Sequence, residues 1–402
     1  MPHSANKLDI TIEKLIYGGD GLARVSGQIV LAPFVLPGER VAVESVEQKP
    51  GLLRSKLIDI IEPSGDRVDA RCPYFMRCGG CHYQHAGYEA QLGFKRAILV
   101  ETLRRVGKIE FPGTIRVIGA EPWQYRNRAQ FHIQGASLGY LEARSKRLCS
   151  IEHCPISSPR INEVIRALRE MLRDPRWPRF IRALEVFTNE EQVQVNVLDA
   201  ERPVARRFFD WCAEKIPGFV PGALDYTAAG ATYRVSGGSF FQVNRLLIDQ
   251  MVAEALGDAA GETALELFAG VGLFSLPLAR RFAEVKAVES GAGALRDLRF
   301  NAERAAASVE AHQNSVDAYL TGAAAPPDFV LADPPRAGLG KVAVRELARL
   351  RPRHITIVAC DPATLARDLA ALVAAGYQLQ GITLIDLFPQ TYHIEAIARL
   401  SR

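Results

Sequence analysis

Short runs of alternating apolar and polar residues open the chain. Four of them, residues 9–13, 27–35, 39–46 and 55–61, are separated by turns rich in Gly and Pro. Alternation with a period of two is typical of half-buried strands, and four or five short strands in succession favour a small closed barrel. The pattern therefore predicts a β-barrel domain over residues 1–62.

The hydrophobic pattern then changes. Between residues 63 and 235, apolar residues with helical spacing predict helices over 88–106 and 160–173. Two alternating runs at 184–188 and 192–198 predict a β-hairpin. This mixture indicates an α+β central region.

From residue 236 to residue 402, apolar strand-like runs alternate with helix-like segments, which is the pattern of a parallel sheet. The expected strands are 263–268, 284–289, 329–332, 355–360 and 382–386. The expected helices are 246–256, 273–280 and 292–306. The sequence thus predicts a multidomain protein with a barrel, an α+β region and a Rossmann-like α/β domain.

Composition narrows the class of protein. The 402 residues are 48% hydrophobic and 23% charged, as in ordinary soluble chains of two or three domains. Met1–Asp9 lacks the apolar core of a signal peptide, and no apolar run is long enough to cross a bilayer. We therefore expect a cytoplasmic protein without membrane contact. In that reducing compartment, seven cysteines favour metal binding or catalysis over disulfides.

Positive charge is concentrated in the middle of the chain. The formal net charge is only +4, but residues 84–182 contain 18 Lys and Arg against nine Asp and Glu. Such a segment is typical of a surface that binds a polyanion, although solvated helix faces give the same count. Charge alone does not tell DNA from RNA.

A glycine-containing loop follows the first expected strand of the α/β domain. In Glu266-Leu-Phe-Ala-Gly270-Val-Gly272 the two glycines let the backbone approach a ligand, but the third glycine of a dinucleotide fingerprint is absent. Glu266 is a poor neighbour for phosphate and suits a ligand with a cationic amino-acid end. Glu289 ends the next strand, where a carboxylate can accept both hydroxyls of a ribose. The combination favours S-adenosylmethionine over turn glycines with a purely structural role.

Three further groups stand near the ends of later strands. Asp333-Pro-Pro-Arg336 places a carboxylate after an apolar run, a pattern that also fits amino-group methyltransferases, in which an aromatic residue usually follows the prolines. Cys360 ends the next strand, although most cysteines in that position are small buried hydrophobes. The C-terminal segment offers His393 and Glu395 as bases.

Two parts of the chain resemble known families. Residues 16–24 and 36–41 are similar to the TRAM module, an OB-like barrel that binds RNA. The segment 241–395 resembles the S-adenosylmethionine-dependent RNA uracil-5-methyltransferases along its whole length. This resemblance implies that Cys360 is the nucleophile and Glu395 the base. It also implies which residues contact the cofactor or the target base. In addition to the loop glycines Gly270 and Gly272, these are Gln242, Phe268, Glu289, Asn314 and Asp333.

The resemblance implies covalent catalysis. Uracil C5 is a weak nucleophile until a thiolate adds at C6, after which C5 can take a methyl group. A base must then remove the C5 proton so that the thiolate can leave. Cys360 and Glu395 are expected to fill these roles. A stacked target base must be turned out to reach Cys360, and Tyr125, Arg126 and Arg128 are candidates for holding the RNA.

Two residues depart from the family pattern. Leu273 stands where ribosomal members often have Asn, and Asp361 follows the nucleophile where Asn is common. A negative charge at Asp361 is expected to raise the pKa of the neighbouring thiol.

Four cysteines suggest a metal site. Cys72, Cys78 and Cys81 lie within ten residues, and Cys154 stands before a proline far downstream. A zinc site commonly uses two Cys-x-x-Cys pairs and only one is present, so this spacing better suits a [4Fe-4S] cluster. The ribosomal-RNA branch of the family carries such a cluster, which implies these four ligands, with Cys149 as the alternative fourth.

These observations lead to one functional hypothesis. The chain is expected to methylate a uridine of 23S ribosomal RNA, as a monomer without an evident protein partner. The alternative enzyme is a transfer-RNA uracil-5-methyltransferase, which the cysteine cluster disfavours. The alternative outside enzymes is a non-catalytic iron–sulphur RNA-binding protein, in which Cys360, Glu289 or Glu395 should have been lost.

Overall fold

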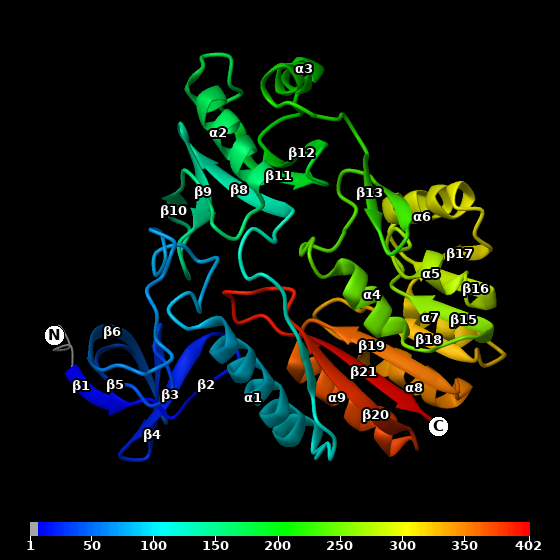
Figure 1. Ribbon diagram of the computed structural model, residues 1–402, viewed down its shortest axis with the longest axis horizontal. Helices are drawn as coiled ribbons and strands as arrows, with labels where there is room; N and C mark the ends of the chain where they lie inside the picture. Colours follow the sequence, from blue (N-terminus) through cyan, green and yellow to red (C-terminus); the bar gives the residue numbers. More distant parts are fainter. Residues whose placement is uncertain (1–6) are drawn as a thin grey trace. The chain divides into compact units, whose positions relative to one another are not determined.

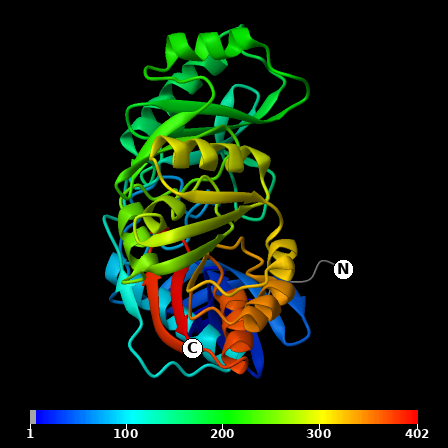
Figure 2. The same ribbon diagram turned by 90° about the vertical axis from the view of Figure 1, so that its right-hand side faces the viewer.

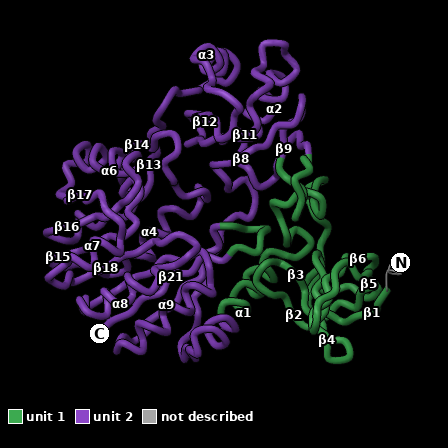
Figure 3. The backbone as a smooth tube through the Cα atoms, turned by 180° about the vertical axis from the view of Figure 1, so that it is seen from behind, with its two compact units in different colours: residues 1–99, 140–149, 388–393 green, residues 100–139, 150–387, 394–402 purple. Residues whose placement is uncertain are grey.

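The computed structural model describes residues 7–402 (Figure 1). The sequence predicted that residues 1–9 are not a signal peptide, and residues 1–6 of that segment lie outside the described residues. The chain divides into two compact units (Figure 3). The first unit consists of residues 1–99, 140–149 and 388–393, and the second of residues 100–139, 150–387 and 394–402.

The strand-rich N-terminus belongs to the first unit. Its six strands pair in the order β1-β5-β6-β4-β3-β2. Because β1 and β2 are the two ends of this order and only residues 12 and 13 separate them in the chain, the sheet must curve back on itself. The bounds are β1 Lys7–Thr11, β2 Lys14–Leu15, β3 Asp20–Val25, β4 Gln28–Pro33, β5 Arg40–Lys49 and β6 Leu52–Glu62. The apolar side chains that alternate along them form one buried cluster: Ile10, Ile12, Ala23, Val30, Ala32, Val35, Val41, Val43 and Leu53.

The central sheet contains the predicted hairpin. Its five strands follow the order β10-β9-β8-β11-β12, and β11 pairs antiparallel with β12. The bounds are β8 Arg128–Gln134, β9 Ser137–Leu141, β10 Leu148–Ser150, β11 Ile181–Thr188 and β12 Val193–Ala200. The accompanying helices are α1 Tyr88–Gly107, α2 Pro159–Arg173 and α3 Arg206–Lys215, and the first two agree with the predicted helices.

Local sequence explains where α2 begins. Ser158 is the N-cap, and its hydroxyl oxygen accepts a hydrogen bond from the Ile161 N–H at 3.3 Å. Pro159 occupies the first helical position, where the missing N–H costs nothing and the fixed φ suits the helix. The apolar face that follows is buried, with Leu168 fully inaccessible.

Buried contacts correct one expectation for the basic segment. Tyr125 is 1% exposed and Arg128 7% exposed, so neither presents a surface to RNA. Arg128 donates to the Glu185 carboxylate at 2.6 Å and to the Ser239 carbonyl at 2.7 Å, and Arg126 donates to the Arg128 carbonyl at 2.7 Å. A buried charge requires such pairing, so these side chains stabilise the fold of the second unit.

An eight-stranded sheet forms the core of the C-terminal part of the second unit. Its order is β17-β16-β15-β18-β19-β21-β20-β7, and β15 to β19 are parallel to one another, whereas β21 runs antiparallel between β19 and β20. The strands are β15 Gly261–Leu267, β16 Phe282–Glu289, β17 Val309–Gln313, β18 Phe329–Ala332, β19 His354–Ala359, β20 Gln378–Ile385 and β21 Glu395–Ser401. The edge strand β7 Arg116–Ile118 comes from the central region and pairs parallel with β20.

Helices pack against this sheet in separate groups (Figure 2). The helix α5 contacts α6, whereas α7, α8 and α9 contact one another in turn. The bounds are α4 Ile248–Leu256, α5 Ser275–Leu278, α6 Ala292–Arg304, α7 Val316–Gly322, α8 Gly340–Leu350 and α9 Pro362–Ala374. A separate hairpin, β13 Leu224–Ala228 with β14 Ala231–Val235, lies beside α6.

The helix α5 is shorter than the predicted 273–280. Pro277 has no N–H to donate to the Leu273 carbonyl, so the helical ladder cannot include that bond. Instead of an N–H of residue 277, the buried Tyr233 hydroxyl donates a hydrogen bond to the Leu273 carbonyl at 3.1 Å.

Among residues 7–402, no helix combines the length and the apolar character needed to span a membrane.

Candidate active site

The predicted site residues of the α/β domain gather at one edge of the eight-stranded sheet. Because β15, β16, β17, β18 and β19 are parallel, their carboxyl ends lie at the same edge, where α/β folds bind ligands. Every one of these residues belongs to the second unit. Phe268, Gly270 and Gly272 follow β15, Glu289 ends β16, Asn314 follows β17, Asp333 follows β18 and Cys360 follows β19.

Glu289 fastens the glycine loop. Its carboxylate accepts the Gly270 N–H at 2.9 Å and the Gly291 N–H at 2.6 Å, so it links the loop after β15 to the loop after β16. Gly270 and Gly272 have φ values of +55° and +91°, which favour glycine, and Phe268 adopts +62° although it carries a side chain. A non-glycine residue held at positive φ is uncommon and often marks a ligand site.

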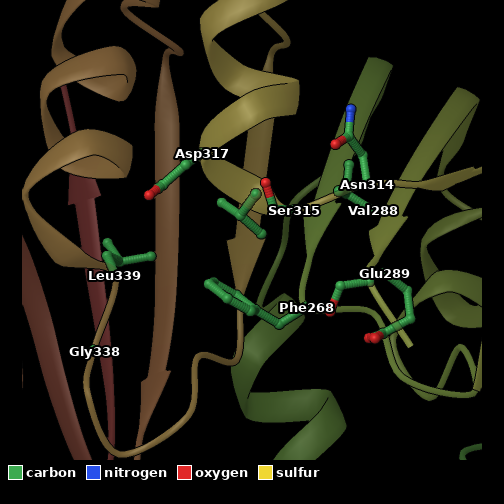
Figure 4. A pocket seen from close by; sticks show the side chains of 10 residues that line it. Phe268, Val288, Glu289, Asn314, Ser315, Asp317, Gly338 and Leu339 are labelled. Atoms are coloured by element: carbon green, nitrogen blue, oxygen red, sulfur yellow. The ribbon is translucent and has the colours of Figure 1, made fainter.

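A cavity of about 240 Å³ lies beside this loop. Phe268, Glu289 and Asn314 line it, so the structure brings together three of the predicted cofactor residues (Figure 4). Asp317 and Leu339 also line it and were not predicted. Asp317 lies in the first turn of α7, where an acidic residue is ordinary for helix stability, so its sequence carries no separate functional signal.

The chemistry of this lining suits a nucleoside. Phe268 and Leu339 offer apolar surface, and Asn314 offers an amide beside the carboxylate of Glu289. Each Glu289 oxygen accepts one backbone N–H and keeps a second lone pair for a ribose hydroxyl. The residues present therefore fit the adenosine part of S-adenosylmethionine.

Glu266 has a different position from the one expected. It is 1% exposed, does not line this cavity, and accepts a hydrogen bond from the Ser275 hydroxyl. Burial, together with the charges of Asp333 and Glu289, raises the pKa of Glu266 to about 8, although the Ser275 bond opposes the shift. Its contacts tie the end of β15 to α5.

Strand register places Cys360 opposite Glu395. In the antiparallel pair of β19 and β21, Val358 faces Ile397 and Ala359 faces Ala396. Continuing this register by one residue sets Cys360 against Glu395, the first residue of β21. Residues directly opposite in an antiparallel pair point to the same face with Cβ atoms about 5 Å apart. The structure therefore brings the predicted nucleophile and the predicted base together.

The electrostatics of this pair are dominated by burial and by neighbouring carboxylates. Burial, followed by the charges of Glu395 and Asp333, raises the pKa of the Cys360 thiol to about 12, and Arg336 acts in the opposite direction. Burial and the Asp333 charge raise the pKa of Glu395 well above its usual range, and Arg336 again opposes this. Burial raises the pKa of Asp333 to about 7. Arg336 is thus the cation that influences both reacting groups, a role the sequence did not reveal.

The loop that carries Asp333 and Arg336 is attached to the helix that follows Cys360. The Thr364 hydroxyl of α9 donates to the Arg336 carbonyl at 3.2 Å, and Asp368 accepts the Leu339 N–H at 2.7 Å. These bonds fix the backbone of the two loops relative to each other within the second unit.

Gln242, another predicted contact, also belongs to this site. Its side-chain amide donates to the Asp333 carboxylate at 3.3 Å. Asn244, two residues on, donates to the Leu387 carbonyl at 3.1 Å, which holds the segment against the C-terminal sheet.

The two departures from the family pattern have structural explanations. Asp361 is the N-cap of α9, and its carboxylate accepts the N–H groups of Ala363 and Thr364 at 3.0 and 2.9 Å. The charges that raise the thiol pKa most are those of Glu395 and Asp333, so the repulsion expected from Asp361 is not the dominant one. Leu273 is 7% exposed, a packed apolar residue.

The predicted cluster ligands do not form a metal site in the structure. Cys72, Cys78 and Cys81 lie on the irregular segment between β6 and α1, Cys149 lies in β10, and Cys154 follows it. The first four belong to the first unit and Cys154 to the second. Throughout residues 7–402 no group of three or more His, Cys, Asp or Glu side chains is arranged to hold a metal ion.

The fold and site define a class: an S-adenosylmethionine-type α/β methyltransferase domain preceded by a small barrel. The family model described as tRNA (Uracil-5-)-methyltransferase matches residues 216–316 and 324–402, and that of the TRAM domain matches residues 6–58. The chain is 34% identical to the 23S rRNA (uracil(1939)-C(5))-methyltransferase RlmD of Pectobacterium atrosepticum, over 98% of this chain and 93% of that protein. It is 32% identical to an uncharacterized RNA methyltransferase of Aquifex aeolicus, over 98% of both chains.

A solved structure agrees with these relatives. The tRNA (uracil-54, C5)-methyltransferase of Pyrococcus abyssi, in complex with S-adenosyl-L-homocysteine, superposes with a TM-score of 0.77 at 26% identity, covering 98% of this chain and all of that one. The chain belongs to the S-adenosylmethionine-dependent RNA uracil-C5-methyltransferase family.

The positions of Asp361 and Glu395 predict different effects on thiol reactivity. Glu395→Gln removes a charge that opposes the thiolate, so alkylation of Cys360 by iodoacetamide at about pH 8.5 should accelerate, about tenfold for each unit by which the thiol pKa falls. Asp361→Asn keeps a capping oxygen and should change the rate by less than about twofold. Mass spectrometry of the peptide that contains Cys360 measures both rates. An equal acceleration in both variants would mean that Asp361 faces the thiol.

Proposed function

We propose that this chain methylates C5 of a uridine in 23S ribosomal RNA, using S-adenosylmethionine, a covalent Cys360 adduct at C6 and proton removal by Glu395. The observation that carries the proposal is the register of β19 and β21, which, continued by one residue, sets Cys360 opposite Glu395 at the sheet edge that also carries the glycine loop. We further propose that the enzyme acts as a monomer in the cytoplasm.

Similarity over nearly the full chain supports ribosomal RNA as the substrate. The named relative at 34% identity acts on 23S rRNA according to its name. The TRAM match supports RNA binding by the N-terminal barrel. Transfer RNA is the second candidate, supported by the family model's description and by the Pyrococcus abyssi enzyme.

The cofactor assignment rests on the cavity beside the glycine loop. We assign the ribose hydroxyls to Glu289, and the adenine ring to the surface between Phe268 and Asn314. We assign Gln242 and Asp333 to the reacting end of the site, because their side chains bond to each other close to Cys360. When bound, S-adenosylmethionine supplies an electrophilic methyl group on a sulfonium.

Cys360, which follows β19, and Glu395, the first residue of β21, would act in different steps of the reaction. The Cys360 thiolate forms a bond to C6 of uracil, which turns C5 into an enolate-like nucleophile that takes the methyl group. Glu395 then accepts the C5 proton, the C5–C6 double bond forms again, and the bond from sulphur to C6 breaks. A buried carboxyl with a raised pKa is a stronger base than an exposed one, which suits Glu395 to this step. The positive charge of Arg336 acts to lower the pKa values of both Cys360 and Glu395, against the effects of burial and of the neighbouring carboxylates.

We also propose that Cys72, Cys78, Cys81 and Cys154 bind a [4Fe-4S] cluster. The support is the number and spacing of the cysteines.

The substrate proposal predicts a clear preference between RNAs. Purified protein with methyl-labelled S-adenosylmethionine should transfer label to a 23S rRNA transcript and not to unmodified transfer RNA. Mapping of 5-methyluridine in a deletion strain should show its loss from 23S rRNA. Label in transfer RNA alone, with ribosomal 5-methyluridine retained, would favour the second candidate.

The mechanism predicts opposite behaviour for the two catalytic variants. Cys360→Ala should lose methylation and form no covalent complex, because no thiolate adds at C6. Glu395→Gln should add and transfer the methyl group but stall before release, giving a protein–RNA band on a denaturing gel. RNA with 5-fluorouridine at the target should trap the unaltered enzyme at the same point. Normal turnover by Glu395→Gln would make His393 the leading base.

The cluster proposal predicts brown protein after purification without oxygen, with iron and sulphide each at about four per chain. Cys154→Ser and Cys149→Ser form a matched pair of variants, and only the first should lose the cluster. Stoichiometric zinc in a colourless protein would contradict the assignment. A full cluster in Cys154→Ser would move the fourth ligand to Cys149.

A further inference from the structure

A second and larger cavity lies in the second unit, on elements that carry none of the proposed catalytic residues. Its volume is about 930 Å³. The loop 175–180 between α2 and β11, the segment after β12, and one side of α3 form its walls. The elements α2, β11, β12 and α3 lie at the top of the view in Figure 1. A cavity of this size can enclose a ligand as large as a nucleotide.

Two tryptophans in its wall have unsatisfied donors. Trp177 is 3% exposed and Trp211 6% exposed, and their rings meet edge to face with centroids 6.4 Å apart. The indole Nε1 atoms of both are buried and have no hydrogen-bond partner among the described residues. Buried indole N–H groups normally find an acceptor. Two orphaned donors in the wall of one cavity therefore point to acceptors supplied by a ligand, which must displace neighbouring side chains because neither nitrogen is exposed in the cavity as it stands.

Arginines surround these indoles. The Arg176 guanidinium lies 4.7 Å from the centre of the Trp211 ring, and that of Arg202 lies 4.4 Å from the centre of the Phe180 ring. Arg179 and Arg207 also line the cavity, and neither forms an ion pair within residues 7–402. Both are exposed, so their charges are available to a phosphate.

The acidic residues of the cavity do not cancel this charge. Glu201 pairs with Arg182 and Asp210 lies 3.8 Å from Arg206, and neither of these arginines lines the cavity. The remaining acid, Glu214, faces Arg176, which already binds Asp174 at 2.8 Å outside the cavity. The lining therefore combines aromatic surface, unpaired hydrogen-bond donors and free guanidinium groups.

We propose that this cavity binds an unstacked, single-stranded nucleotide of the RNA substrate, separate from the target uridine. The base packs against the aromatic walls, the indole N–H groups of Trp177 and Trp211 donate to its acceptors, and Arg179 and Arg207 bind the flanking phosphates. This inference rests on the proposed function only in requiring that the substrate is RNA.

The test uses the full chain and whichever RNA the unaltered protein methylates. Arg179→Gln with Arg207→Gln should weaken RNA binding about tenfold at moderate salt and lower the slope of log affinity against log salt by about 0.7 for each lost phosphate contact. Trp177→Phe with Trp211→Phe keeps the rings and removes the donors, so affinity should fall severalfold with an unchanged salt slope. Fluorescence anisotropy over a salt series measures both effects. Arg166→Gln, on the exposed side of α2, is the matched control and should leave affinity and slope unchanged.

Several outcomes would overturn the proposal. Folded variants that bind RNA like the unaltered protein would mean that water satisfies the indoles. If Arg166→Gln weakened RNA binding as much as the Arg179→Gln and Arg207→Gln double variant, the effect would be a general one of positive charge and not of this cavity. Saturation of the tryptophan fluorescence by uridine or adenosine monophosphate, with RNA binding unaffected, would assign the cavity to a small ligand. Affinity for S-adenosylmethionine, measured by calorimetry, should be unchanged in every variant. Methylation of transfer RNA instead of ribosomal RNA would contradict the proposed function while leaving this test intact.

Discussion

The register between β19 and β21 is the constraint on which the proposed chemistry depends. Because β21 runs antiparallel between β19 and β20, a residue near the C-terminus is carried back to the strand end that bears Cys360. A slip of one residue would turn Glu395 to the other face of the sheet. Burial does not prevent such a slip, since β21 is buried on both faces from Glu395 to Ala398. The ion pair between Arg399, on the same face as Glu395, and the buried Glu254 of α4 anchors the far end of the strand, and a shifted register would separate this half-buried pair.

Excess negative charge at the carboxyl edge of the sheet is expected to couple binding of the cofactor to the proposed chemistry of the Cys360 thiol. Glu395, Asp333 and Glu266 all have raised pKa values, with burial as the main cause, and Arg336 is the cation that opposes the shift at Glu395. A ligand that brings a sulfonium and an ammonium group would favour the ionised carboxylates and the Cys360 thiolate alike. Burial disfavours the Cys360 thiolate when no cation is near. Burial also strengthens the effect of a cation that binds beside the thiolate, because charges interact more strongly where water is excluded. The thiol is therefore expected to gain acidity when the cofactor is present.

Sequence patterns predicted the parts of the fold that depend on local periodicity. Strand β18 has the predicted bounds, the helices α1 and α2 agree with their predicted spans, and the alternating runs at 184–188 and 192–198 pair as a hairpin. The short edge strand β7 was missed because three residues carry no readable period, and it gains its place only by pairing with β20. The burial of Arg128 was likewise unreadable, since its partner Glu185 lies 57 residues away. For the site, the residue types were readable, whereas the opposition of Cys360 and Glu395 required the strand order.

Asp361 shows how a residue's local role can cancel an effect inferred from its charge. Adjacent to a thiolate, a carboxylate raises the thiol pKa by simple repulsion. Here that carboxylate caps α9 and accepts two N–H groups, and the positive end of the helix dipole lies at the same place. The positive helix terminus opposes the negative charge of Asp361 as seen from Cys360. Asp before Pro362 is itself a capping signal, since Asp favours the N-cap and Pro the first helical position. The sequence Cys-Asp-Pro thus places a thiol at the end of a strand and begins the next helix with a capping carboxylate, while burial and the charges of Glu395, Asp333 and Arg336 have the main effects on the thiol pKa.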